Sequence, residues 1–194
     1  ITDVKKVTAL KERQTVKRVC EKMDVAQGKL VMGFNFAFGD DDSTLGAMIM
    51  SDIFGGGPYS RLFTNVREKL SLCYYCSATS FRRKGFMMVD CGVEKENAEK
   101  AETAILEQLD VMKRGEFSDF EFASSVKSIR DSLKSYRDSK RALDIWYTIR
   151  ITAENVYSPE EIIEKLESVT KECVVNAANV CKYNTVYKLM PEDK

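Results

Sequence analysis

Alternating apolar and polar positions predict where the strands of this chain lie. Residues 29–38 show the alternation most clearly, and one face of the resulting strand must be covered by other elements. The apolar residues of this face are Leu30, Met32, Phe34, Phe36 and Phe38. Residues 72–80 and 85–93 are rich in strand formers and flank a short basic segment, so they predict an antiparallel hairpin. The lead-in before residue 28 and the segment 183–189 predict one further strand near each end.

Apolar residues spaced three and four positions apart predict the helices. Segments with this spacing lie at 43–54, 60–69, 94–114, 141–151 and 171–181. Two more helices are expected to begin at Ser118 and Ser158, because Glu121 and Glu161 follow three residues later in the pattern of a capping box. Gly115 is placed to end the helix before the first box. The chain therefore reads as strands interleaved with helices.

This order of elements predicts an α+β fold, in which helices pack on one face of an antiparallel sheet of four to five strands. Both chain ends are expected to contribute edge strands. No linker rich in proline, glycine or serine, no low-complexity tract and no repeat of fixed period interrupts the sequence. Residues 1–194 are therefore expected to form a single domain.

Composition and charge narrow the classes of function. Lysine plus arginine and aspartate plus glutamate each number 30, so no long-range field favours nucleic acid or an anionic membrane as a partner. There is no apolar run of membrane-spanning length and no leading signal segment, which predicts a soluble chain that is not exported. Histidine is absent, which removes the commonest catalytic base and the commonest zinc ligand, so the chain alone is not expected to be a metallohydrolase. A chain that starts at Ile1 is expected to be a piece of a longer protein.

The six cysteines are expected to be free, structural thiols, because a core-rich chain of this size needs no disulfides. Cys73 and Cys76 have the spacing of zinc ligands, but no second pair lies nearby in the sequence. On a strand of period two, their sulfurs would also point to opposite faces. We therefore expect no metal site here, and a thiol-based redox or metal domain stays a minor alternative.

The stretch of residues 54–74, FGGGPYSRLFTNVREKLSLCY, combines a flexible turn, a helix and the start of a strand. Its three glycines are Gly55, Gly56 and Gly57. They fit either a tight helix-to-helix turn or a loop that lets a ligand backbone pass closely. Arg67 lies on the flank of the helix, and Tyr74 follows seven residues later on the strand. Each is an ordinary residue when taken singly, but together they place a guanidinium and a phenol on one side of a short turn.

This stretch closely resembles the C-terminal half of the M16 metallopeptidases, the family of pitrilysin, insulin-degrading enzyme and mitochondrial processing peptidase. The resemblance continues through the hairpin, the long helix after residue 94 and the helical tail, from about residue 20 onward. It implies one α+β half of a two-half protein that closes around an extended peptide. It also implies that zinc is held outside this chain, in an N-terminal half or partner subunit that carries His-x-x-Glu-His.

The resemblance assigns roles to Arg67 and Tyr74, which match an arginine and a tyrosine that reach into the family's cleft. An arginine fork can hold substrate carbonyl oxygens, and a phenol can donate to the oxyanion that forms during peptide-bond hydrolysis. The glycines 55–57 would form a loop of the same cleft. The implied partners are the N-terminal M16 half or a homologous subunit, in a homo- or heterodimer, and an extended peptide substrate. No cofactor is expected in this chain itself.

One departure from the family pattern concerns Ser71, which stands where the family usually has glycine. With serine in place of glycine, the turn that leads into Tyr74 could have a different shape from that of the family. A second reading of the whole chain is a non-catalytic interaction subunit, whose sheet edge and apolar face dock a peptide or a catalytic partner.

Overall fold

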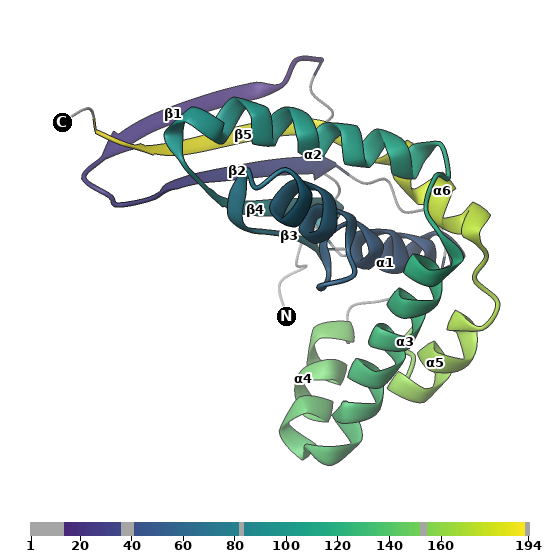
Figure 1. The fold of residues 1–194 in the computed structure, drawn as a ribbon. Helices are drawn as coiled ribbons and strands as arrows, with labels where there is room; N and C mark the ends of the chain where they lie inside the picture. Colours follow the sequence, from purple (N-terminus) through teal and green to yellow (C-terminus); the bar gives the residue numbers. More distant parts are fainter. Residues whose placement is uncertain (1–13, 36–40, 82–83, 152–154, 193–194) are drawn as a thin grey trace.

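Five strands form one sheet whose order differs from their order along the chain. The computed structural model describes residues 14–35, 41–81, 84–151 and 155–192. The strand order across the sheet is β1-β5-β2-β4-β3 (Figure 1). The strands are β1 (Lys17–Met23), β2 (Gly28–Asn35), β3 (Cys73–Phe81), β4 (Phe86–Val93) and β5 (Lys182–Pro191). The α+β prediction and the hairpin of β3 and β4 are confirmed.

The pairing corrects two details of the prediction. The pairs β2–β4, β3–β4 and β2–β5 are antiparallel, but β1 pairs with β5 in parallel, so the sheet is mixed. The C-terminal strand β5 is not an edge, because it lies between β1 and β2. The physical reason is visible in the side chains: β5 buries Val186 and Met190, whereas β1 is charged and almost wholly exposed, as suits an edge.

Helices cover one face of the sheet. In Figure 1, α2 runs lengthwise along the sheet beside β5 and α1 and α6 lie near one end of it, whereas α3, α4 and α5 extend away from it. The helical elements are α1 (Asp41–Gly55), η1 (Leu62–Lys69), η3 (Lys95–Asn97), α2 (Ala98–Lys113), α3 (Asp119–Ser135), η4 (Tyr136–Asp138), α4 (Lys140–Arg150), α5 (Pro159–Leu166) and α6 (Lys171–Val180). Both predicted capping boxes are present, at the starts of α3 and α5. Within the described ranges, no helix is both long and apolar enough to cross a lipid bilayer.

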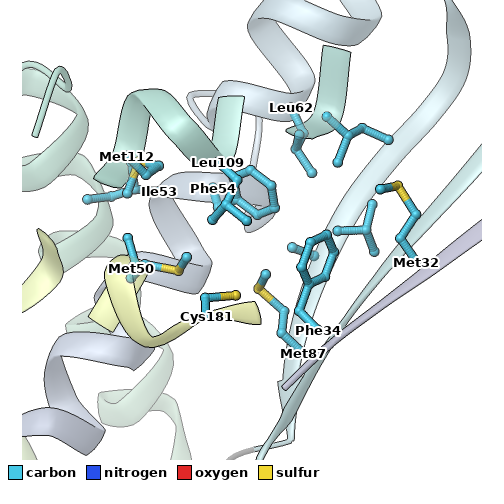
Figure 2. Packing of buried hydrophobic residues seen from close by; sticks show 14 of the residues in the cluster. Met32, Phe34, Met50, Ile53, Phe54, Leu62, Met87, Leu109, Met112 and Cys181 are labelled. Atoms are coloured by element: carbon cyan, nitrogen blue, oxygen red, sulfur yellow. The ribbon is translucent and has the colours of Figure 1, made fainter. Parts of the chain in front are cut away.

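The core lies between the covered face of the sheet and the helices. Met32, Phe34 and Met87 of the strands point toward side chains of α1 and α2, including Phe54 and Leu109 (Figure 2). Each of these side chains is at most 2% exposed, and burying one such side chain stabilises the fold by about 1.5–3 kcal/mol. The alternation predicted for the second strand is therefore confirmed as far as Phe34, while Phe36 and Phe38 lie outside the described residues.

Candidate functional site

The three glycines before η1 form a close-packed turn. A Cβ atom at Gly55 would lie 2.4 Å from the backbone nitrogen of Ala78 in β3, so the end of α1 approaches the sheet only because the side chain is absent. A Cβ at Gly56 would likewise meet the side chain of Asp52. Gly57 follows, and its carbonyl accepts a hydrogen bond from the Ser60 nitrogen. The helix-to-helix turn is what the structure contains, and the role of these glycines as a cleft loop stays a prediction.

The helix that carries Arg67 is wound more loosely than an α-helix. The Leu70 nitrogen donates to the carbonyl of Asn65, five residues earlier, at 3.2 Å. Hydrogen bonds that span five residues define a π-helix, a form that is often found at functional sites. Leu62 and Val66 face the core, so Arg67 is placed on the flank of the buried stripe, as predicted.

The turn from η1 to β3 depends on Ser71. Its φ angle is +50°, the left-handed conformation that glycine adopts without strain. The Leu72 nitrogen then donates to the carbonyl of Val66 at 3.2 Å, which ties the turn back to the helix. The turn therefore keeps a glycine-type backbone even though a serine occupies the position.

Arg67 and Tyr74 are brought into contact by this turn. The Arg67 Nε atom donates to the carbonyl oxygen of Tyr74 at 2.7 Å. Its Nη1 atom lies 3.1 Å from the carboxylate of Glu68, and the guanidinium stacks over the ring of Phe63, 4.6 Å from the centroid. The arginine is thus held in one orientation at the mouth of the site.

Tyr74 faces outward because β3 contains a bulge. Cys73 pairs with Val93 and Tyr75 pairs with Gly92, so Tyr74 is the extra residue between them. Its side chain is 54% exposed, and its hydroxyl donates to the carboxylate of Glu94. This hydrogen bond, together with the negative charge of Glu94, raises the pKa of Tyr74 above its usual value.

Glu94 is a site residue that the sequence analysis missed. It follows directly after β4, and the hairpin register places the end of β4 opposite the start of β3. Predicting the register of the hairpin from the sequence would therefore have placed Glu94 beside Tyr74.

The residues of this turn surround an open hollow with a volume of about 380 Å³. Its lining includes Arg67, Glu68, Ser71, Cys73, Tyr74 and Glu94. A cation, a phenol and two carboxylates thus meet at one surface depression. Such a set can hydrogen-bond the carbonyl and amide groups of a peptide backbone.

Three thiols meet beside the same hollow, which overturns one prediction. The sulfur atoms of Cys73, Cys76 and Cys91 all lie within 4.8 Å of one another. The expectation that Cys73 and Cys76 point to opposite faces is wrong, because the bulge at Tyr74 shifts the alternation by one residue. The third thiol, Cys91, comes from β4, where it pairs directly with Cys76.

The electrostatics of the three thiols differ. Hydrogen bonds from Cys76 and then Cys91, with the nearby charge of Arg67, lower the pKa of Cys73. Donation to Cys73, with burial, raises the pKa of Cys76. All six cysteines of the chain are free thiols.

The zinc site implied by the family resemblance does not fit the residues around the hollow. That site needs two histidines and glutamates, and the chain contains no histidine. The thiols, phenol and carboxylates here form a different donor set. No step of peptide hydrolysis can therefore be derived from a metal held in that way by this chain.

Comparisons with known proteins agree on one kind of relative. A family model described as the peptidase M16 inactive domain matches residues 3–129. Over 179 residues, or 92% of this chain, the sequence is 34% identical to the probable inactive metalloprotease YmfF of Bacillus subtilis (strain 168), of which it covers 42%. The chain spans less than half the length of the curated relatives it matches.

Solved structures share the fold. A conserved protein from Enterococcus faecalis V583 superposes with a TM-score of 0.88 at 25% identity, over 96% of this chain and 44% of that one. The peptidase M16 inactive domain from Pseudomonas fluorescens superposes with a TM-score of 0.73 at 17% identity, over 98% of this chain and 47% of that one. The second likeness concerns the fold alone.

Proposed function

Because the chain belongs to the family of M16 peptidase inactive domains, as a domain of the C-terminal type, we propose that it is the half without the metal site and that it presents Arg67 and Tyr74 to an extended peptide. The observation that carries the proposal is the contact between these two residues at the rim of an open hollow. The contact joins two separate elements, because Arg67 lies on η1 and Tyr74 lies on β3.

Arg67 supplies the fixed positive charge of the proposed site. Its guanidinium is held by the Tyr74 carbonyl, by Glu68 and by the ring of Phe63, so little side-chain entropy remains to be lost when a ligand binds. A guanidinium fork can donate to peptide carbonyl oxygens. Arg67 therefore positions the backbone of the peptide.

Tyr74 supplies a hydroxyl whose proton is already engaged by Glu94. A substrate oxygen that carries developing negative charge would compete with the Glu94 carboxylate for this proton. Because the phenol stays protonated well above neutral pH, it is always a donor at the site. This competition would make Tyr74 respond most strongly to an oxyanion rather than to a neutral carbonyl.

The proposed partner is an N-terminal M16 half or a homologous subunit that carries His-x-x-Glu-His. That partner would supply zinc and the general base, and the pair would enclose an extended peptide. The assignment to a longer two-domain parent, to a homo- or heterodimer and to the bacterial cytoplasm belongs to the same proposal.

A second candidate function is a purely non-catalytic docking subunit. The relative YmfF is named a probable inactive metalloprotease, and this name favours a non-catalytic role. β3 is also one of the two outer strands of the sheet, and the backbone groups of its outer edge could pair with an extended peptide. In this case peptide binding would not depend on Arg67 or Tyr74.

Peptide binding to the 194-residue chain separates the two candidates. The anisotropy of a fluorescently labelled, extended peptide is measured against increasing protein. If Arg67 positions the peptide, Arg67→Ala weakens binding by about tenfold, the loss typical of one hydrogen bond to a charged group. Tyr74→Phe weakens it less, because the neutral carbonyl of the ground state competes poorly with Glu94.

Matched controls remove an equivalent group elsewhere. Lys69→Ala deletes an exposed cation from the same helix, and Tyr187→Phe deletes a tyrosine hydroxyl that donates to Glu21 at 2.8 Å. Both controls are expected to bind like the unmodified chain. Binding that is unchanged in Arg67→Ala would reject the proposed site and support the docking subunit.

A further inference from the structure

The three thiols beside the hollow form a compact cluster with a graded exposure. Cys91 is wholly buried and Cys76 is 6% exposed, whereas Cys73 is half-buried and lines the hollow. The cluster is thus closed toward the core and open on one side. Among the described residues, the other cysteines take no part in such a group; they are Cys20, Cys173 and Cys181.

The backbone holds the cluster in place independently of any ligand. Cys76 and Cys91 are direct cross-strand partners in the hairpin, so their separation is fixed by the β3–β4 register. The bulge at Tyr74 then turns Cys73 onto the same face, opposite Val93. If Tyr74 instead occupied a regular position in the ladder, Cys73 would lie three positions from Cys76 and would point to the opposite face. Three donors on two paired strands are therefore preorganised.

The distances suit a metal ion that prefers sulfur. Three thiolates around one zinc ion, each at about 2.3 Å, lie roughly 4 Å from one another. The sulfur atoms here already lie within 4.8 Å, so only a small closure is needed. Soft thiolate ligands select zinc(II) and copper(I) over magnesium, calcium and manganese.

We propose that Cys73, Cys76 and Cys91 bind one thiophilic metal ion, zinc(II) or copper(I), as a three-thiolate site whose open side faces the hollow. Binding of zinc(II) displaces three thiol protons to solvent and leaves one net negative charge on the site. The guanidinium of Arg67, which already acts on Cys73, offsets that charge. The ion enters through the hollow, and the fourth position is left to water or to a ligand in the hollow. This site is separate from the histidine-based zinc site of the proposed partner.

Metal titration of the complete, fully reduced chain under anaerobic conditions tests the proposal. Cobalt(II) serves as the spectroscopic probe, because thiolate-to-cobalt charge-transfer bands report sulfur ligands directly. One equivalent of cobalt is expected to produce these bands, and zinc(II) or copper(I) is expected to displace it. Competition against a chromophoric chelator then gives the affinity for each ion and shows which of the two is preferred.

Serine variants identify the ligands. Cys91→Ser and Cys76→Ser are each expected to weaken metal binding by about 100-fold or more, because loss of a ligand costs more than the 10- to 100-fold typical for loss of a residue that only supports a ligand. Cys73→Ser removes the half-buried ligand with little risk to the fold and is expected to have the same effect. The matched control is Cys181→Ser, which removes a buried thiol outside the cluster and is expected to retain full binding.

Three results would overturn the proposal. The first is binding of less than a tenth of an equivalent, and the second is binding that all three cluster variants retain. The third is a protein that binds no metal but readily forms a Cys76–Cys91 disulfide on mild oxidation, seen as a loss of two mass units. None of these measurements uses a peptide, so failure of the metal-site proposal would leave the proposed peptide site unaffected.

Discussion

At the scale of single residues, the state of Tyr74 is set by Glu94. The carboxylate accepts the phenolic proton, and its charge disfavours the phenolate, so the pKa of Tyr74 is raised. Glu94→Gln removes the charge and keeps the shape. It is expected to lower the pKa of Tyr74 toward the ordinary value of a tyrosine.

The measurement is the pH titration of tyrosine ring carbons by NMR, with the Tyr74 signal assigned from Tyr74→Phe. The signal of Tyr187, which donates to Glu21, is the internal control and should not move. An unchanged titration of Tyr74 in Glu94→Gln would show that the two side chains are not coupled.

Ser71 carries the backbone strain of the turn into Tyr74. A non-glycine residue in the left-handed region costs about 1–2 kcal/mol, and glycine gives back about 0.5–1 kcal/mol through its larger loss of entropy on folding. Ser71→Gly is therefore expected to raise the free energy of unfolding in urea by about 0.5 kcal/mol. The control is Ser77→Gly in the regular part of β3, which should lower it. If Ser71→Gly destabilises the fold as much as Ser77→Gly does, the backbone at Ser71 is not strained.

The proximity of Arg67 and Tyr74 could be predicted from the sequence, because a helix, a short turn and a strand follow one another along the chain. Their role in a site was inferred from the family resemblance and stays a prediction. Glu94 and Cys91 were not predicted, because their positions depend on the register of a hairpin. The bulge at Tyr74 depends on one extra residue in one strand, for which alternation of apolar positions gives no signal.

At the scale of elements, a buried ion network fastens α2 to the end of the sheet that carries β1 and β5. Glu102 of α2 is 4% exposed and lies 2.8 Å from both Lys188 of β5 and Arg18 of β1. The hydroxyl of Tyr183, also on β5, donates a hydrogen bond to the Glu102 carboxylate at 2.9 Å. Burial alone would raise the pKa of Glu102, but the hydrogen bonds from Lys188, Tyr183 and Arg18 lower it.

This network predicts how stability depends on pH. Because the pKa of Glu102 is lower in the folded state than in the unfolded state, its stabilisation is present above the ordinary glutamate pKa of 4.5 and is lost as the pH falls through the folded pKa. Glu102→Gln is expected to lower the free energy of unfolding at neutral pH by about 1–3 kcal/mol, since Lys188 then keeps Glu99 as its only carboxylate partner among the described residues. The difference should shrink in acid, as urea unfolding at several pH values will show.

The exposed Glu107 of the same helix provides the control. Glu107→Gln should change the stability by less than about 0.5 kcal/mol at every pH. If the free energy of unfolding of Glu102→Gln depends on pH as it does in the unmodified chain, Glu102 does not contribute to the pH dependence of stability.

The order of the strands marks the limit of prediction at this scale. Periodicity and capping boxes located the five described strands and the longer helices, because these signals depend on neighbours in the sequence, but they did not separate the short helices η3 and η4. The parallel pairing of β1 with β5 joins residues near the two ends of the described chain, and no local pattern encodes it. The charged character of β1 was nevertheless a usable sign that it forms an edge.

At the scale of the whole molecule, the proposed function makes the chain one part of a larger assembly. It spans less than half the length of its curated relatives and has no histidine with which to build their family's zinc site. What it does offer is an open hollow lined by a fixed guanidinium, a phenol and the Cys73 thiol, with the buried thiols of Cys76 and Cys91 behind Cys73. The proposed activity therefore exists only when a complementary half is present.

Peptide cleavage by the reconstituted pair tests this central claim most directly. The chain is combined with a half that carries His-x-x-Glu-His, and kcat/KM is measured for the unmodified chain, Arg67→Ala, Tyr74→Phe and the controls Lys69→Ala and Tyr187→Phe. We predict that both site variants lower kcat/KM by about 10- to 1,000-fold, the range for loss of a positioning or oxyanion-stabilising donor, with the controls unchanged. If both site variants cleave the peptide as fast as the unmodified chain, Arg67 and Tyr74 do not form the site.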